Sequence, residues 1–389
     1  MPVGTMTHGE VLHLLRTHGP LTRKDLLALS RLSRTTLVER IDTLQQLRLI
    51  REGRRGVAGT GRPPVLLEFD ETSRTTLTFD VGAAHALIAI TDLAARRLAV
   101  RELPIDLTGR PAPVLRKLVT AGRQLLETAS PDGAELLGVG FSFPGLQGRV
   151  DGTIEAPAVL SHWDGRPVAE PFERAFGRPV VVANDAHAMA YGESVADGRG
   201  RTVIVVKLAT GIGAGLVVDG RLHTGDSHGA GQFGHMRVPG LEEDCTCGQR
   251  GCLATVASGR ALLRRLAPYG VTSLPDIVNG VVSGDRACEE ALADAGRAVG
   301  TVLSGVATMI DPGVILFGGT LGVLDPFVDA ARESILGLTY PRTAQEIHVG
   351  RTVLGDESAV TGLAAMIVDS ALQPDAVDHL VAARPDGAA

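Results

Sequence analysis

The sequence predicts an α/β protein in which a small helical module at the N-terminus precedes two similar α/β halves. Three observations predict this division. The charge changes sign near residue 70, apolar residues before that point recur at helical spacing, and a strand–turn–strand pattern occurs twice after it. Of the 389 residues, 44% are hydrophobic and 21% are charged, so the chain can bury ordinary cores and is not mostly disordered.

The formal net charge of −6 is an average over two unlike segments. Residues 1–70 contain 11 basic and 7 acidic side chains, a net of +4, which leaves −10 on the remainder. All eleven basic residues lie between Arg16 and Arg62. A basic segment on an acidic protein is typical of a nucleic-acid-binding arm, and a solvated helical face is the alternative.

Local patterns predict three helices in this basic segment. Apolar residues 11, 12, 14 and 15 share one side of the first helix, which Gly19 and Pro20 end. Thr22 followed by Asp25 predicts a capping box for the second helix. Ser33 caps the third, whose apolar residues recur at spacings of four, three and three: Leu37, Ile41, Leu44 and Leu47. This spacing leaves four residues free to face outward: Arg34, Thr35, Thr36 and Arg40. Two helices joined by a short turn predict a helix-turn-helix.

A glycine- and arginine-rich stretch follows the third helix. Residues 53–64 read GRRGVAGTGRPP and precede an apolar strand over 65–67, which predicts a basic wing; a flexible linker is the alternative. The third helix would enter the major groove of double-stranded DNA, while Arg62 would contact phosphate or a narrow minor groove. The candidate DNA-binding residues are Ser33, Arg34, Thr35, Thr36, Arg40, Arg54, Arg55 and Arg62.

From residue 73 onward, short apolar strands alternate with glycine turns and longer helices. The stretch 77–91 reads as strand, tight turn and strand, and 203–219 repeats this layout. Helices are expected over 113–130, 186–195, 287–310 and 358–372, with buried strands over 137–141, 180–182 and 314–317. The stretch from Pro374 is expected to be a frayed tail.

Three of the four cysteines lie within eight positions, after a histidine. His235, Cys245, Cys247 and Cys252 offer one imidazole and three thiolates, which complete a tetrahedral zinc shell with no open position. We therefore expect structural zinc, with three reduced surface cysteines as the alternative. Cys288 stands alone in a helix and is expected in the core.

Asn184 and Asp185 directly follow a buried strand, where α/β folds place ligand-binding groups. The carboxylate could accept the proton of a sugar hydroxyl or simply bind it, and the alternative is that Asp185 caps the next helix. The glycine turns at 210–215 and 318–319 can bring backbone amides close to phosphate, although such turns also serve geometry alone.

Taken together, these motifs resemble the ROK (repressor, ORF, kinase) family, and more narrowly its winged-helix transcriptional regulators. The resemblance rests on FDVG at 79–82, PG at 144–145, ANDA at 183–186, TGIGAG at 210–215, the GH and CxCGxxGC cassette, and DPGVILFGG at 311–319. It implies a two-lobed, actin-like sugar kinase fold behind the winged helix, with sugar between the lobes and a dimeric or tetrameric assembly. The candidate effector-binding residues are Gly145, Asn184, Asp185, Gln232 and His235.

The departures from the family's kinases concern phosphate and sugar binding. A phosphate-binding threonine is replaced by alanine after Gly82, in Ala83-Ala84, and three sugar-binding residues are replaced by Ala158, Gln232 and Ala254. Asp185 stands where the kinases hold their general base and is expected to be vestigial, because phosphoryl transfer depends mainly on positioning and charge stabilisation. Trp163 could wall the cleft, with burial in the core as the alternative.

We expect a winged helix-turn-helix domain over 1–72 and a ROK domain over 73–389. Lobe I would span about 73–190 plus a C-terminal helix at about 358–373, and lobe II about 191–357. The expected function is a cytoplasmic, non-enzymatic repressor of carbohydrate-related genes that binds a pseudo-palindromic operator as a homodimer or homotetramer and involves no membrane. The expected effector is a sugar or sugar phosphate, with another carbohydrate or no ligand as the alternatives. The alternatives are an ATP-dependent sugar kinase with a DNA-binding arm and a zinc-stabilised scaffold.

Overall fold

Three helices and a small sheet open the chain in the computed structural model, which describes residues 6–55, 64–131, 133–148 and 150–383. The helices are α1 (His8–His18), α2 (Arg23–Ser30) and α3 (Arg34–Gln46). The antiparallel sheet has the order β1-β3-β2, from β1 (Leu21–Thr22), β2 (Ile50–Arg55) and β3 (Val65–Phe69). Residues 56–63, which hold most of the predicted wing, lie outside the described residues.

Side-chain caps set where α2 and α3 begin. The Thr22 hydroxyl accepts the N–H of Asp25 at 3.1 Å, and the Asp25 carboxylate accepts the N–H of Thr22 at 3.0 Å. Ser33 Oγ accepts the N–H of Thr36 at 3.1 Å. Both caps satisfy amides that a helix N-terminus leaves without partners, so both predicted starts are confirmed.

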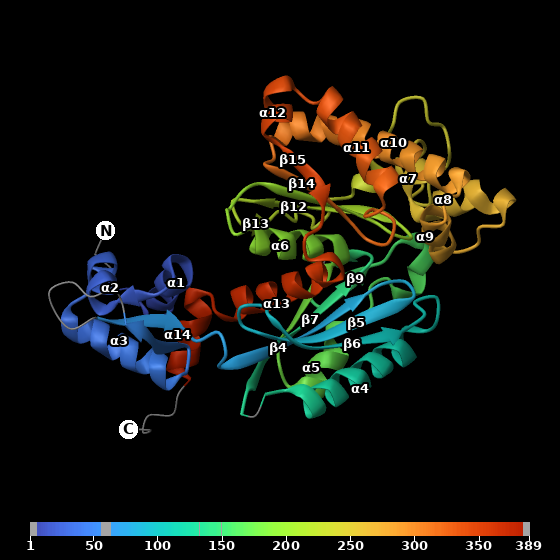
Figure 1. Cartoon of the computed structure of the whole chain (residues 1–389). Coiled ribbons are helices and arrows are strands. Elements are labelled where there is room, and N and C mark those ends of the chain that lie inside the picture. The colour runs from blue at the N-terminus through green and yellow to red at the C-terminus, as the bar shows by residue number, and fades with distance from the viewer. Residues whose placement is uncertain (1–5, 56–63, 132, 149, 384–389) are drawn as a thin grey trace.

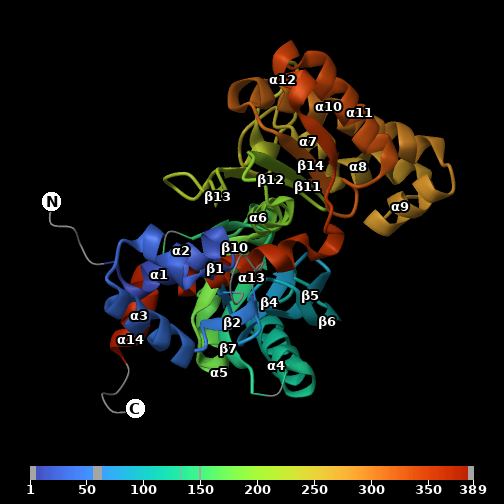
Figure 2. The same ribbon diagram turned by 60° about the vertical axis from the view of Figure 1, so that its left-hand side comes forward.

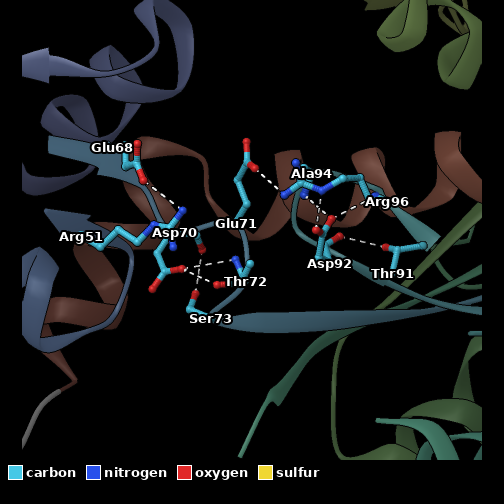
Figure 3. A network of polar contacts seen from close by, with 10 residues as sticks. All are labelled: Arg51, Glu68, Asp70, Glu71, Thr72, Ser73, Thr91, Asp92, Ala94 and Arg96. Atoms are coloured by element: carbon cyan, nitrogen blue, oxygen red, sulfur yellow. Dashed lines mark hydrogen bonds and ion pairs between the residues drawn. The ribbon is translucent and has the colours of Figure 1, made fainter. Parts of the chain in front are cut away.

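Polar contacts order the connection between this N-terminal module and the first α/β half (Figure 3). Asp70 Oδ1 accepts the N–H of Thr72 at 3.2 Å and its hydroxyl at 2.9 Å. Arg96, on the next hairpin, pairs with Glu71 at 2.6 Å and with Asp92 at 2.8 Å. The connection is therefore ordered by its own turn at Asp70 and tied to the first half through Glu71.

Each α/β half is built on a five-stranded sheet, and the two sheets have equivalent strand orders (Figure 1). The first has the order β10-β7-β4-β5-β6, from β4 (Arg74–Val81), β5 (His85–Asp92), β6 (Arg97–Pro104), β7 (Glu135–Phe143) and β10 (Val180–Asn184). The second has the order β13-β12-β11-β14-β15, from β11 (Val203–Leu208), β12 (Ile212–Val218), β13 (Arg221–Leu222), β14 (Val314–Gly318) and β15 (His348–Arg351). In each sheet an antiparallel hairpin is extended by two parallel strands, which confirms the predicted similarity of the halves.

Helices cover the outer faces of both sheets. The first half carries α4 (Pro111–Ala129) and α5 (Ala169–Phe176), with the short strands β8 (Leu146–Gln147) and β9 (Ile154–Glu155) nearby. The second half carries α7 (Ala254–Ala257), α8 (Gly259–Leu266), α9 (Leu274–Val282), α10 (Arg286–Ile310), α11 (Asp325–Leu338) and α12 (Pro341–Glu346). Trp163 is fully buried and donates its indole N–H to the Leu107 carbonyl at 2.8 Å, so it belongs to the core, as Cys288 does. No helix among the described segments has the length and apolar character needed to cross a bilayer.

Two helices lie between the sheets, α6 (Asp185–Asp197) and α13 (Ser358–Ala371) (Figure 1). α6 packs on β11 and β12, while α13 packs on β4 and β7, and the two helices pack on each other. The expected lobe border at residues 190 and 191 falls inside α6, where the helix continues unbroken.

The C-terminal segment is a helix, α14 (Pro374–Ala382), and it lies beside α1 (Figures 1 and 2). Val377 is completely buried in the same core as Leu12 and Leu15. The N–H of Gly9 donates to Asp378 Oδ1 at 3.0 Å. The expectation of a frayed tail from Pro374 is therefore wrong, because this amphipathic segment completes the core of the N-terminal module.

Candidate functional site

Asn184 joins the end of β10 to the start of α6, and both its side-chain oxygen and its side-chain nitrogen form hydrogen bonds. Its Oδ1 accepts the N–H groups of Ala186 at 3.0 Å and His187 at 3.1 Å, which makes it the N-cap of α6. Its Nδ2 donates to the Gly145 carbonyl at 2.7 Å. Two predicted effector residues, Gly145 and Asn184, are thus brought together, and the helix cap is Asn184 rather than Asp185.

Asp185, the first residue of α6, forms an ion pair with Lys207 of β11. Lys207 Nζ lies 2.7 Å from Asp185 Oδ2, and the two side chains are 16% and 13% exposed. Burial alone would lower the pKa of Lys207, but the carboxylates of Asp185 and Asp80 outweigh it and raise the pKa above its usual value. Lys207 is therefore a cation that joins the second sheet to the carboxylate of Asp185.

Asp80 and Ser142 extend this charged cluster into the first sheet. Ser142 Oγ donates to Asp80 Oδ1, across the parallel pair of β4 and β7. We call Asp80, Ser142, Asp185 and Lys207 the interlobe cluster. Lys207 is not among the residues predicted from the sequence, although a charged residue inside the apolar stretch VIVVKL is a signal for it.

Gln232 and His235 lie at a short 3-10 turn, Phe233–His235, and both are exposed. The N–H of His235 donates to the Gln232 carbonyl at 3.0 Å. Within the described part of the chain, no hydrogen bond links either side chain to Gly145, Asn184 or Asp185. The structure thus brings together three of the five predicted effector residues, Gly145, Asn184 and Asp185. The His235 side chain instead lies beside Cys245.

A hollow of about 300 Å³ lies beside Asn184, along the edge strand β10. This volume is at the lower end of the range for small-molecule sites, roughly 300–1,000 Å³. Its polar lining side chains are Gln147, Asp151, Asn184, His187, Thr224, His228 and Ser370. Burial lowers the pKa of His187, and its Nε2 lies 2.9 Å from the Ala230 carbonyl, so the ring is neutral near pH 7.

The four predicted zinc ligands converge in the second half. The ligand atoms of His235, Cys245, Cys247 and Cys252 all lie within 4.8 Å of one another. The sulfurs of Cys247 and Cys252 are 3.7 Å apart, and Cys245 Sγ lies 3.6 Å from His235 Nδ1. Two thiolates bound tetrahedrally at about 2.3 Å from zinc are separated by about 3.8 Å, so the spacing fits that ion.

The N-terminal end of α3 presents the predicted DNA-reading residues. Ser33, Arg34 and Thr35 are exposed, and Thr36 is half-buried. The hydroxyls of Ser33 and Thr36 lie 2.8 Å apart as part of the cap. In the segments the structure covers, Arg34 and Thr35 have no side-chain hydrogen bond or ion pair, so both are available to a ligand.

The predicted basic residues farther along are placed less uniformly. Arg40 was expected to face outward, but its guanidinium lies 3.2 Å from His8 Nε2 and 3.1 Å from Glu39, and its side chain is only 20% exposed. The expectation is wrong because Arg40 faces α1, where His8 is buried. Arg54 and Arg55 lie at the end of β2 with side chains outside the described set, and Arg62 lies outside the described residues.

Comparison with known proteins places this geometry in a family. The ROK family model matches residues 76–370. A putative xylose repressor from Caldicellulosiruptor sp. is 25% identical over 94% of this chain and 96% of its own length. A glucokinase from Streptomyces coelicolor is 30% identical, over 78% of this chain and 99% of its own length.

A solved structure has the same overall arrangement. A ROK family transcriptional regulator, described as a homolog of the E. coli MLC protein, superposes with a TM-score of 0.79 at 23% identity. The superposition covers 97% of this chain and 98% of the other, so it includes the N-terminal module as well as both halves. The chain is a member of the ROK family.

Proposed function

We propose that this protein is a DNA-binding transcriptional regulator, a repressor of carbohydrate-related genes, whose kinase-like body senses an effector. The observation that carries the proposal is the end of α3, where Arg34 and Thr35 are exposed on a three-helix module with a β-hairpin, the arrangement of a winged helix-turn-helix. The repressor of similar length supports the same reading, because it matches both the module and the body.

Sugar phosphorylation is not expected from the interlobe cluster. Asp185, at the position of the kinase base, is already held by Lys207 at 2.7 Å. The turn after β4 carries Ala83, which has no hydroxyl for a phosphate. A carboxylate that is already paired with an ammonium group, in a site whose turn offers no hydroxyl to a phosphate, lacks the positioning that phosphoryl transfer needs.

The effector site is proposed between the two halves, at Gly145, Asn184 and Asp185, with Gln232 and His235 contributed by the other half. The ligand class is a sugar or sugar phosphate. A homodimer or homotetramer would present two modules to a pseudo-palindromic operator in the cytoplasm. These assignments follow the family resemblance together with the placement of Asn184 at the start of a helix between the sheets.

Selection of bound fragments from bacterial genomic DNA tests the function. We expect enrichment of a pseudo-palindromic site, with affinity that falls steeply as salt rises. Arg34→Ala should relax sequence preference and weaken specific binding by roughly 1–3 kcal/mol, while Arg342→Ala, an equal charge change on the exposed surface of α12, should have little effect. The absence of any enriched site would support the scaffold, and turnover of ATP with a panel of hexoses would support the kinase.

Structural zinc is proposed at His235 and the three cysteines. The four residues would close the coordination shell, which leaves no open position for a substrate. Bound zinc would therefore stabilise the fold of the loop between the 3-10 turn Phe233–His235 and α7 and would take no part in a reaction. Metal analysis of the purified chain should find one zinc per chain. Cys252→Ser should lose it and lower the unfolding temperature, whereas Cys288→Ser, in the core of α10, should retain it; equal zinc content in both variants would contradict the assignment.

A further inference from the structure

A single carboxylate, that of Asp369 near the end of α13, contacts two different parts of the molecule. Its Oδ1 accepts a hydrogen bond from Arg16 Nη2 of α1 at 2.6 Å. Its Oδ2 accepts the hydroxyl of Tyr191, on α6. Asp369 therefore lies where the N-terminal module, α13 and α6 meet.

Arg16 is held at this junction by more than the ion pair. Its Nη1 donates to the Leu372 carbonyl at 3.3 Å, and its guanidinium carbon lies 5.7 Å from the centre of the Phe69 ring. The Arg16 side chain is 19% exposed and that of Asp369 is 43% exposed, so the pair is only partly shielded from water. One arginine thus connects α1, β3 and the end of α13.

Tyr191 connects the same carboxylate to the proposed effector site. It lies on α6, whose first turn carries Asp185 and whose cap is Asn184. Burial, together with the neighbouring Asp369, raises the pKa of Tyr191 above its usual value, so the hydroxyl stays protonated and donates. A movement of α6 along its axis would therefore pull directly on Asp369.

α6 and α13 are built to move as one unit. A Cβ added to Gly362 would lie 1.9 Å from the Ala188 carbonyl oxygen, so the two helix backbones touch where they cross. The buried carboxylate of Glu193 accepts the N–H groups of Val353 at 2.8 Å and Leu354 at 3.0 Å, just before α13. A close backbone contact and a buried acceptor leave little room for the helices to slide past each other.

We propose that Asp369 is a positioning residue that sets the orientation of the N-terminal module by holding Arg16 and Tyr191 at once. Displacement of α6 by a ligand at its N-terminus would then carry α13 and Asp369 with it, strain the contact between Asp369 and Arg16 of α1, and so change the orientation of α3. The regulatory meaning rests on the proposed function, whereas the positioning role does not.

Single-molecule energy transfer in the full-length protein tests the positioning role. Fluorophores attached through azido-phenylalanine at the exposed positions Lys24 of α2 and Arg116 of α4 report the orientation without using the cysteines. The unaltered protein should give one narrow distribution. Tyr191→Phe, which removes only a hydroxyl, and Asp369→Asn should broaden or shift this distribution. Asp369→Glu, which keeps the carboxylate, should give a distribution closer to that of the unaltered protein.

The control is Asp329→Asn, which removes a carboxylate that pairs with Arg332 on α11, far along the chain from the junction. It should leave the distribution unchanged. If Tyr191→Phe and Asp369→Asn, with unfolding temperatures near that of the unaltered protein, also leave it unchanged, the proposal is wrong.

Operator binding separates this proposal from the proposed function. With a selected operator, Tyr191→Phe should change the dissociation constant by about fivefold or more, the lower range of allosteric coupling. If no operator is found, the energy-transfer result still decides whether Asp369 positions the module. An altered distribution with an unchanged dissociation constant would contradict the regulatory part alone.

Discussion

Lys207 occupies the carboxylate of the Asn184-Asp185 motif through an ion pair. The carboxylate that follows Asn184 is in place, but it accepts the N–H of Ala186 at 2.9 Å and the ammonium of Lys207 at 2.7 Å. An ion pair with both side chains less than a fifth exposed depends on both partners, because removing one leaves the other charge poorly solvated.

Lys207→Met should therefore lower the free energy of unfolding by about 3 kcal/mol, because Asp185 keeps its charge without a counter-ion. The double variant Lys207→Met with Asp185→Asn should recover much of that loss. Urea unfolding measures both. A Lys207→Met variant as stable as the unaltered protein would show that the pair contributes nothing.

His187 makes stability depend on pH. Burial lowers its pKa in the folded state below the value of 6.5 in the unfolded chain, so the unfolded state binds more protons at acid pH. The stability is present above pH 6.5 and is lost as pH falls toward the folded pKa. His187→Gln should make the decline below pH 6.5 shallower by up to about 1.4 kcal/mol per pH unit, as measured by urea unfolding at several pH values. His348→Gln, at an exposed position, is the control for the loss of an imidazole, and an unchanged slope in His187→Gln would contradict the prediction.

At the scale of elements, the crossing of α6 and α13 is specified by small residues. A Cβ at Gly192 would lie 2.0 Å from the Ser358 carbonyl oxygen, and one at Gly362 would meet the Ala188 carbonyl. Neither glycine is needed for its backbone conformation, since both lie inside helices. They are needed for the close approach of the helix that begins at the proposed effector site.

Gly362→Ala should lower the free energy of unfolding by about 3 kcal/mol, because a backbone carbonyl cannot move aside as a flexible side chain can. Gly305→Ala in α10, where an added Cβ meets open space, should instead raise it by up to about 1 kcal/mol through helix propensity. Thermal and urea unfolding compare the two. Equal effects would show that the helices do not touch at Gly362.

At the scale of the whole molecule, the two ends of the chain form one core. Val368, Leu372 and Val377 pack with the apolar residues of α1, α2 and α3. The N-terminal module is therefore not an independent domain joined by a linker, because its core includes residues from the end of α13 and from α14.

Val377→Ala should lower the unfolding free energy by roughly 2 kcal/mol and weaken operator binding, because it opens a cavity under α1. Leu380→Ala, on the same helix but 43% exposed, should change stability by less than about 0.5 kcal/mol. Unfolding followed by a probe in the N-terminal module distinguishes them. Equal stability of the two variants would mean that α14 is not part of this core.

Much of the architecture could be read from local sequence. The caps at Thr22 and Ser33, the strand–turn–strand repeats and the long helix ending at Ile310 are each encoded within a few residues, because caps and apolar periodicity act at short range. The segment after Pro374 was expected to be frayed, because its apolar face can be buried only against α1, which lies at the other end of the sequence. Arg40 was misjudged for the same reason, because its partner His8 is 32 residues away.

By itself, the sequence determined the order of the elements, the grouping of three cysteines with His235 and the exposed start of α3, because each depends on residues close together in the chain. Only the tertiary structure decided that Lys207 neutralises Asp185, that α14 completes the N-terminal core, and that Asp369 lies between Arg16 and Tyr191. These contacts join residues from 22 to more than 350 positions apart. Such pairings depend on how whole elements pack, and no local pattern of residues encodes them.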